Sequence, residues 1–191
     1  IEFGQREPLW YLPNLYHTWT MNAGDQTVQF ISLHTKIIDE DPGQVEWFIR
    51  TITESTADWV ILCIHHPIYS AGKNGNRNRS KWIIENIKPY VDQYKVGLVL
   101  QGHDHNLQHI YNPNEATQYV TSGAGHDLNP QDDDATEFVE EELGGVIEYF
   151  GKDYGFVGLK ISGDVATVSY YTRDGILDHE FTQVNPRNAR K

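Results

Sequence analysis

Two histidines separated by one residue follow an apolar segment in the middle of the chain. Residues 96–101 read Val-Gly-Leu-Val-Leu-Gln, and Gly102-His103-Asp104-His105 come directly after them. In extended backbone alternate side chains point the same way, so we expect His103 and His105 on one side and Asp104 on the other. Ligand sites in α/β sheets lie at the carboxyl ends of strands. Because neutral imidazole binds zinc, iron and copper, the pattern indicates a candidate metal site.

A second apolar segment, residues 58–64, ends in the same way, in His65-His66-Pro67. A helical pattern separates the two segments, which favours a crossover unit with parallel strands. Their carboxyl ends then share one edge of the sheet, so His65 or His66 is expected to approach His103 and His105. Three converging imidazoles suit a metal ion, although any one of them, taken alone, is also compatible with a packed or surface histidine.

The remaining pattern predicts the elements that would position these histidines. Continuous apolar runs are typical of buried parallel strands, and apolar residues at helical spacing after Asp41-Pro42 predict a capped helix. The result is a layered α/β fold with a mixed sheet. We expect strands at 11–21, 27–35, 58–66, 96–103 and 118–125, helices at 41–55 and 80–94 (broken near Pro89), an acidic loop or frayed helix at 131–142, and antiparallel strands over 154–184 with turns at Gly163-Asp164 and Asp174-Gly175.

Composition excludes some classes of partner. The 191 residues carry 27 acidic and 15 basic side chains, for a net charge of −12, which argues against nucleic acid as a ligand. No apolar run approaches the length that membrane insertion needs. The single cysteine, Cys63, cannot form an internal disulfide and is expected to be a packed residue. The triplet Asn78-Arg79-Ser80 is a possible N-glycan site.

Four stretches together carry a resemblance to a known family. They are "HHPIYS" from His65, "QGHDHNLQHI" from Gln101, "YVTSGAG" from Tyr119 and "LGGVIEYFGKDYGFVGLKIS" from Leu143. In this order and spacing they resemble the metallophosphoesterase superfamily, in particular the small animal-type purple, or tartrate-resistant, acid phosphatases. The resemblance implies a four-layer α-β-β-α sandwich with mixed sheets. We expect residues 1–191 to form one domain, the C-terminal part of a calcineurin-like metallophosphoesterase domain, with the N-terminal part of the fold missing.

The same resemblance implies a dinuclear centre, with iron paired with iron, zinc or manganese. His65 and His103 would bind the divalent ion and His105 the ferric ion. Asp104 would be an outer partner, and His66 a packed or solvent-facing residue. Nothing in residues 1–58 stands in for the family's upstream Gly-Asp, Gly-Asp-x-x-Tyr and Gly-Asn-His motifs. We therefore expect a metal-binding part of a longer enzyme, inactive when isolated.

Two departures from the family pattern lie on the expected substrate side. Asn74 occupies a position where relatives often have a histidine near the leaving group, and an amide cannot act as an acid. His126 follows the Ser-Gly-Ala-Gly turn, where relatives usually have asparagine. Its imidazole could bind phosphate and share a proton with the leaving oxygen. A solvated loop histidine beside the acidic stretch is the alternative.

The expected function is therefore hydrolysis of phosphate monoesters, either small molecules or phosphoproteins, in a lysosomal or secreted acid phosphatase. Two alternatives stay open. One is a phosphodiesterase of the same superfamily, against which Asp104 and the following Asn106-Leu107-Gln108 count. The other is a truncated, non-catalytic relative that binds metal or a partner, which the absent upstream motifs favour.

Overall fold

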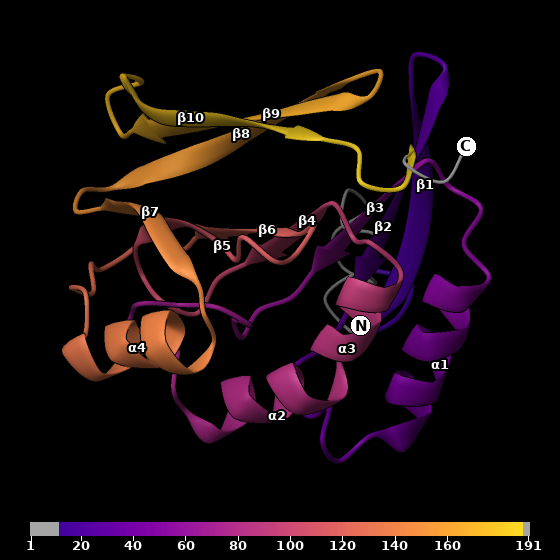
Figure 1. Cartoon of the computed structure of the whole chain (residues 1–191), viewed down its shortest axis with the longest axis horizontal. Helices are drawn as coiled ribbons and strands as arrows, with labels where there is room; N and C mark the ends of the chain where they lie inside the picture. The colour runs from indigo at the N-terminus through magenta and orange to yellow at the C-terminus, as the bar shows by residue number, and fades with distance from the viewer. Residues whose placement is uncertain (1–11, 189–191) are drawn as a thin grey trace.

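The computed structural model, which describes residues 12–188, has three layers. Figure 1 shows the helices below a large sheet and a small sheet above it. Within the described residues the large sheet has seven strands in the order β1-β2-β3-β4-β6-β5-β7, and the small sheet has the order β10-β9-β8. The predicted α/β fold with a mixed sheet is confirmed. No helix of the described residues covers the outer face of the small sheet.

The bounds of the elements follow the sequence pattern closely in the middle of the chain. The strands are β1 His17–Ala23, β2 Gln26–Ser32, β3 Trp59–Cys63, β4 Leu98–Gln101, β5 Leu107–Tyr111, β6 Gln118–Ser122, β7 Val146–Gly151, β8 Gly155–Ser162, β9 Val165–Thr172 and β10 Leu177–Val184. The helices are α1 Pro42–Thr53, α2 Asn78–Asn86, α3 Lys88–Gln93 and α4 Asp133–Glu137, which continues into a π-helical turn, η2 Phe138–Glu142. No helix in the described part of the chain is long and apolar enough to cross a membrane.

Three local predictions are confirmed by the backbone. Asp41 caps α1, because its side chain accepts a hydrogen bond from the Gln44 amide, and Pro42 begins the helix. The predicted helix 80–94 is broken at Ile87, just before Pro89, into α2 and α3. The turns of the small sheet contain Gly163 and Gly175 at φ angles of 58° and 78°, where glycine has no steric penalty.

Two parts of the fold differ from the expectation, and a third settles between two alternatives. The aromatic lead-in segment forms β1 only from His17 and pairs with β2 as an antiparallel hairpin; Tyr11, where it was expected to begin, lies outside the described residues. Strand β5, which the sequence pattern missed, pairs antiparallel with both β6 and β7. The acidic stretch, for which a loop or a frayed helix was expected, is helical, because Asp132 caps α4 through the Ala135 amide and Phe138 is buried.

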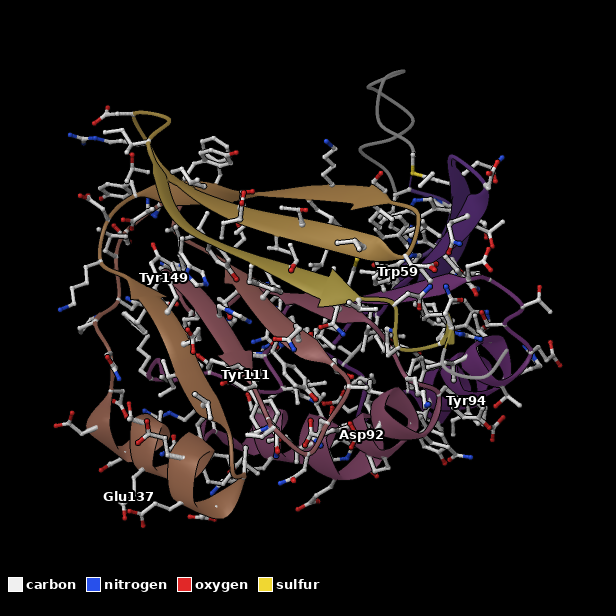
Figure 2. The ribbon with its side chains drawn as sticks, turned by 45° about the horizontal axis from the view of Figure 1, so that its top comes forward. Trp59, Asp92, Tyr94, Tyr111, Glu137 and Tyr149 are labelled. Atoms are coloured by element: carbon white, nitrogen blue, oxygen red, sulfur yellow. The ribbon has the colours of Figure 1, made fainter. Side chains whose placement is uncertain are left out.

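Successive side chains of β3 point alternately into two hydrophobic cores. Val60 and Leu62 belong to the core between the large sheet and the helices. Trp59 and Ile61 face the small sheet, where they join Val168 in a second core. All four β3 side chains are fully buried, so the strand reads as a continuous apolar run. Figure 2 shows Trp59 and Tyr149 at the two ends of the space between the sheets.

The three crossover helices lie on one face, so the strands they join run parallel. Strand β3 pairs parallel with β2 and β4, and β4 pairs parallel with β6. The ladder continues past the strand ends, because the Ile64 amide donates to the Leu100 carbonyl and the Gly102 amide donates to the His65 carbonyl. The predicted alignment of the two histidine-bearing strand ends is therefore present.

A buried carboxylate joins α3 to the large sheet. Glu115 accepts hydrogen bonds from the Tyr69 and Tyr119 hydroxyls, both at 2.9 Å, and from the Lys88 ammonium at 2.7 Å. Lys88 also donates to Asp92 at 2.8 Å. The Glu115 side chain is 12% exposed and that of Asp92 37%. A largely buried charged group with three donors is costly to remove, whereas an exposed partner contributes little.

We predict that Glu115→Ala lowers the free energy of unfolding by about 3 kcal/mol, because it removes the acceptor that two hydroxyls and Lys88 share and leaves Lys88 with the more exposed Asp92. Asp92→Ala, the matched control on the same lysine, should cost less than about 1 kcal/mol. Urea unfolding followed by circular dichroism measures both values. Equal losses would show that the buried contacts of Glu115 contribute no more than the exposed pair.

A buried histidine links the two sheets. His109 of β5 is 4% exposed and stacks on Phe181 of β10 with ring centroids 3.6 Å apart. Its Nδ1 lies 3.0 Å from Nε2 of His179, and its Nε2 lies 2.8 Å from the Gln118 side-chain oxygen. Burial, reinforced by the neighbouring His179, lowers the pKa of His109 to about 4, although the Gln118 contact opposes the shift.

Because this pKa lies below that of an unfolded histidine, the unfolded chain binds more protons between about pH 6.5 and pH 4. Folded stability should therefore fall as the pH drops through this window. We predict that the loss between pH 7 and pH 5 is about 2 kcal/mol smaller in His109→Gln than in the unmodified chain. Urea unfolding at both pH values tests this, and an unchanged difference would contradict it.

Candidate metal centre

The paired strand ends bring three imidazoles together. His65 and His66 follow β3, and His103 follows β4. One ring nitrogen of each lies within 4.8 Å of the others. The closest pair is His65 Nε2 and His103 Nδ1, at 3.0 Å. Two nitrogens bound tetrahedrally to one zinc ion are about 3.3 Å apart, so this pair needs only a slight opening to accept a metal.

The imidazoles of this group favour their neutral forms. The pKa of His65 is lowered by partial burial and by the proximity of His105. The pKa of His103 is lowered by partial burial and by His65, although Asp104 opposes the shift. Histidine must be neutral to bind a metal, so the donor set fits a transition-metal ion.

His66 differs from its two neighbours because its ring is tied to Thr35. The Thr35 hydroxyl accepts a hydrogen bond from the His66 backbone amide at 3.0 Å and lies 2.8 Å from His66 Nδ1. Thr35 is 1% exposed, and Nδ1 is the one acceptor recorded for its hydroxyl hydrogen within the described residues. The hydrogen-bond network therefore assigns the hydrogen of neutral His66 to Nε2, which makes that atom a donor rather than a ligand.

His103 does not lie in extended backbone. Strand β4 ends at Gln101, and His103 has a φ angle of 68°, in the left-handed region that non-glycine residues rarely adopt. The predicted separation of side chains is nevertheless present, because Asp104 is fully buried while His103 and His105 are half-buried. A turn produces this separation, and simple strand alternation does not.

The Asp104 carboxylate connects the loop after His66 to the loop after β4. It accepts hydrogen bonds from the Ser70 hydroxyl at 2.6 Å and from the Asn74 side-chain amide at 2.7 Å. Gly72 passes so close that an added Cβ would lie 2.5 Å from the Asp104 carboxyl carbon. Asp104 is thus an outer, positioning carboxylate within the described structure, and one amide hydrogen of Asn74 is committed to it.

His105 lies with a different set of side chains. Its ligand atom and those of His126 and Asp127 lie within 4.8 Å of one another. The His126 side chain is 85% exposed, and its Nδ1 lies 3.3 Å from an Asp127 carboxylate oxygen. The structure therefore brings His65 and His103 together as predicted, but it groups the predicted ligand His105 with the predicted substrate residue His126.

Sequence reasoning missed residues at the end of the neighbouring parallel strand. Leu33-His34-Thr35 follow β2 at the same edge of the sheet, and the Leu33 amide donates to the Cys63 carbonyl. His34 lies close enough to His66 to help lower its pKa, and its buried Nδ1 has no hydrogen-bond partner among the described residues. The strand-end rule that pointed to His65 or His66 and to His103 would also have pointed to this segment.

A cavity of about 520 Å³ opens beside His65, between the carboxyl ends of the parallel strands and β8 of the small sheet. Burial raises the pKa of the Cys63 thiol at this cavity to about 11, so the thiol is a packed, unreactive group as predicted. The residues that line this cavity are Ser32, Leu33, Cys63, Ile64, His65, Leu100, Gln101, Gly102, Val120, Ser122, Val157 and Leu159.

Comparisons with known proteins agree with this geometry. Tartrate-resistant acid phosphatase type 5 of Oryctolagus cuniculus is 29% identical over 136 residues, which are 69% of this chain and 39% of that protein. Purple acid phosphatase 4 of Arabidopsis thaliana is 30% identical over 138 residues, 68% of this chain and 36% of that protein. The chain thus spans less than half the length of these curated relatives.

A solved structure shows the same fold. The purple acid phosphatase PPD1 from yellow lupin seeds superposes with a TM-score of 0.70 at 17% identity, covering 96% of this chain and 36% of that one. The family model for the calcineurin-like phosphoesterases matches residues 2–107, more than half of the chain, including both histidine-bearing strand ends. The chain therefore belongs to the calcineurin-like phosphoesterase family, as its motifs predicted.

Proposed function

We propose that this chain forms the histidine-rich part of the metal centre of a phosphate-monoester hydrolase. The observation that carries the proposal is the 3.0 Å approach of His65 and His103 at adjacent parallel strand ends, in a chain of the calcineurin-like phosphoesterase family. In this proposal His65 and His103 hold the divalent ion of a dinuclear centre, which is iron, zinc or manganese, and His105 binds the other ion, a ferric one. When bound, the metals supply the positive charge that water needs to attack a phosphate ester.

The neighbouring side chains have separate roles in this proposal. His66 donates its Nε2 hydrogen to a phosphate oxygen and binds no metal, because Thr35 holds the other ring nitrogen. Lys73 is exposed and near enough to His103 to disfavour its protonation. In a chain with a net charge of −12, this lysine gives local attraction for an anionic substrate.

Asn74 is fixed by Asp104 and keeps one amide hydrogen for the substrate, but it has no proton to give as an acid. Catalysis in this site therefore needs either a good leaving group or a proton from elsewhere. The fully buried Asp104 stays a positioning residue, since its oxygens are engaged with Ser70 and Asn74.

We further propose a secreted or lysosomal setting, in which Asn78 carries an N-glycan. Asn78 is exposed at the first turn of α2, which supports this site. Ser80 of the same triplet is buried, and its hydroxyl donates to the Asn74 carbonyl at 2.9 Å.

We predict that His65→Ala and His103→Ala each lower metal-dependent hydrolysis of 4-nitrophenyl phosphate by more than about 100-fold, because loss of a ligand should exceed the 10–100-fold cost of losing an outer partner. His66→Ala should cost less than about 10-fold, since it removes one neutral hydrogen bond. Lys160→Ala, an exposed change on β8, is the control. The assay uses the product of the complete reading frame.

Three results would contradict the proposal. Equal losses at His65 and His66 would refute the assignment of the ligand. Faster turnover of bis(4-nitrophenyl) phosphate than of the monoester would favour a phosphodiesterase. Metal binding without hydrolysis of either substrate would support the non-catalytic alternative.

A further inference from the structure

The side chains of His105, His126 and Asp127 come from two loops that lie against each other. Their ligand atoms lie within 4.8 Å of one another, and none of them belongs to the group around His65. His105 is half-buried at the base, and the other two are exposed above it. The rings of His105 and His126 are nearly perpendicular, with centroids 6.4 Å apart. Converging donors of this kind need an explanation beyond the proposed roles of His65 and His103.

The backbone holds the two loops together on both sides of His126. The Gly123 amide donates to the Asn106 carbonyl at 3.0 Å, and the Asn129 amide donates to the His105 carbonyl at 2.8 Å. Gly123 lies so close to Asp104 that an added Cβ would be 2.0 Å from its carbonyl oxygen. The position of His126 and Asp127 relative to His105 is therefore set by fixed backbone contacts, although their side chains are exposed.

The donor chemistry suits a transition metal. Two imidazole nitrogens and one carboxylate oxygen are a known ligand set for catalytic zinc and for non-haem iron, and they leave coordination positions open for water or substrate. Asp127 supplies a negative charge that the group around His65 lacks. His126 Nδ1 and the Asp127 oxygen are already 3.3 Å apart, close to the separation of two ligands on one ion.

We propose that His105, His126 and Asp127 form a second transition-metal site, built from this chain alone and adjacent to the ion held by His65 and His103. The proposal rests on the proposed function and deepens it, because it adds His126 and Asp127 to His105 as ligands of the second ion. The two sites are neighbours, since His105 lies two residues after His103 in the loop between β4 and β5. In this role His126 is a ligand, whereas the sequence suggested a phosphate-binding acid.

The test is a titration of the purified 191-residue chain, freed of metal by chelation, with Co²⁺ as the probe. Visible absorption gives the ligand field, and elemental analysis after gel filtration gives the stoichiometry. We expect two Co²⁺ ions per chain. His126→Asn and Asp127→Asn should each weaken one of the two binding steps by at least about 100-fold and leave the other unchanged, since loss of a ligand should exceed that of an outer partner. Asp153→Asn, an exposed aspartate elsewhere, is the matched control and should change neither step.

The variants separate this inference from the proposed function. His126 and Asp127 are exposed, so their replacements should fold, and far-ultraviolet circular dichroism checks this. His103→Ala should remove the other binding step. The second site would be overturned, and the first would stand, if the unmodified chain binds one ion that is lost in His103→Ala and kept in His126→Asn. Two ions that survive both His126→Asn and Asp127→Asn would also overturn it. If His103→Ala binds as many ions as the unmodified chain, that result would instead count against the proposed function.

Discussion

Burial of one carboxylate constrains the whole edge of the sheet that carries the candidate metal centre. Asp104 has no exposed surface, so its charge must be compensated by hydrogen bonds within the protein. Ser70 and Asn74 provide them, which ties the loop after β3 to the loop after β4. Because Asp104 points inward, its neighbours His103 and His105 are turned outward. Its carbonyl oxygen also forms the surface against which Gly123 packs, so the third loop is placed by the same residue.

The two cores make this constraint possible. Strand β3 is buried on both faces, between the helices and the small sheet, so its register with β4 cannot slip without moving apolar side chains from one core to the other. That register fixes His65 beside Gly102. The imidazoles then meet at the edge where the parallel ladder ends and backbone groups no longer pair. The site is thus rigid at its base and open at its rim, where His126 is exposed.

Much of this arrangement could be predicted from sequence, because the signals were local. The apolar runs of β3 and β4, the Asp41 cap and the break near Pro89 each depend on a few adjacent residues. Strand β5 could not be recognised in this way. It contains buried Gln108 and His109, whose partners lie on distant elements, and it pairs with β7, about forty residues further along the chain.

The candidate site was predictable to a similar extent and for the same reason. Strand ends predicted that His65 or His66 lies near His103, since parallel pairing follows from the crossover connection, and both do. The grouping of His105 with His126 depends on a turn with a left-handed residue at His103 and on contacts between loops, and neither leaves a periodic signal. The tautomer of His66 depends on Thr35, thirty-one residues earlier.

The net charge of the chain limits how the candidate site could attract a phosphate ester. A phosphate ester is an anion, and this chain carries a net charge of −12, so long-range attraction between them is unfavourable. Salt screens that repulsion beyond roughly 10 Å, which leaves the outcome to the groups at the site itself. Neutral imidazoles contribute no charge, and the basic side chains that act on them are Lys73 and Arg79, of which Arg79 is paired with Asp39. Under the proposed function, the positive charge that binds the substrate would therefore come largely from metal ions, a role for which imidazoles are better suited than arginines.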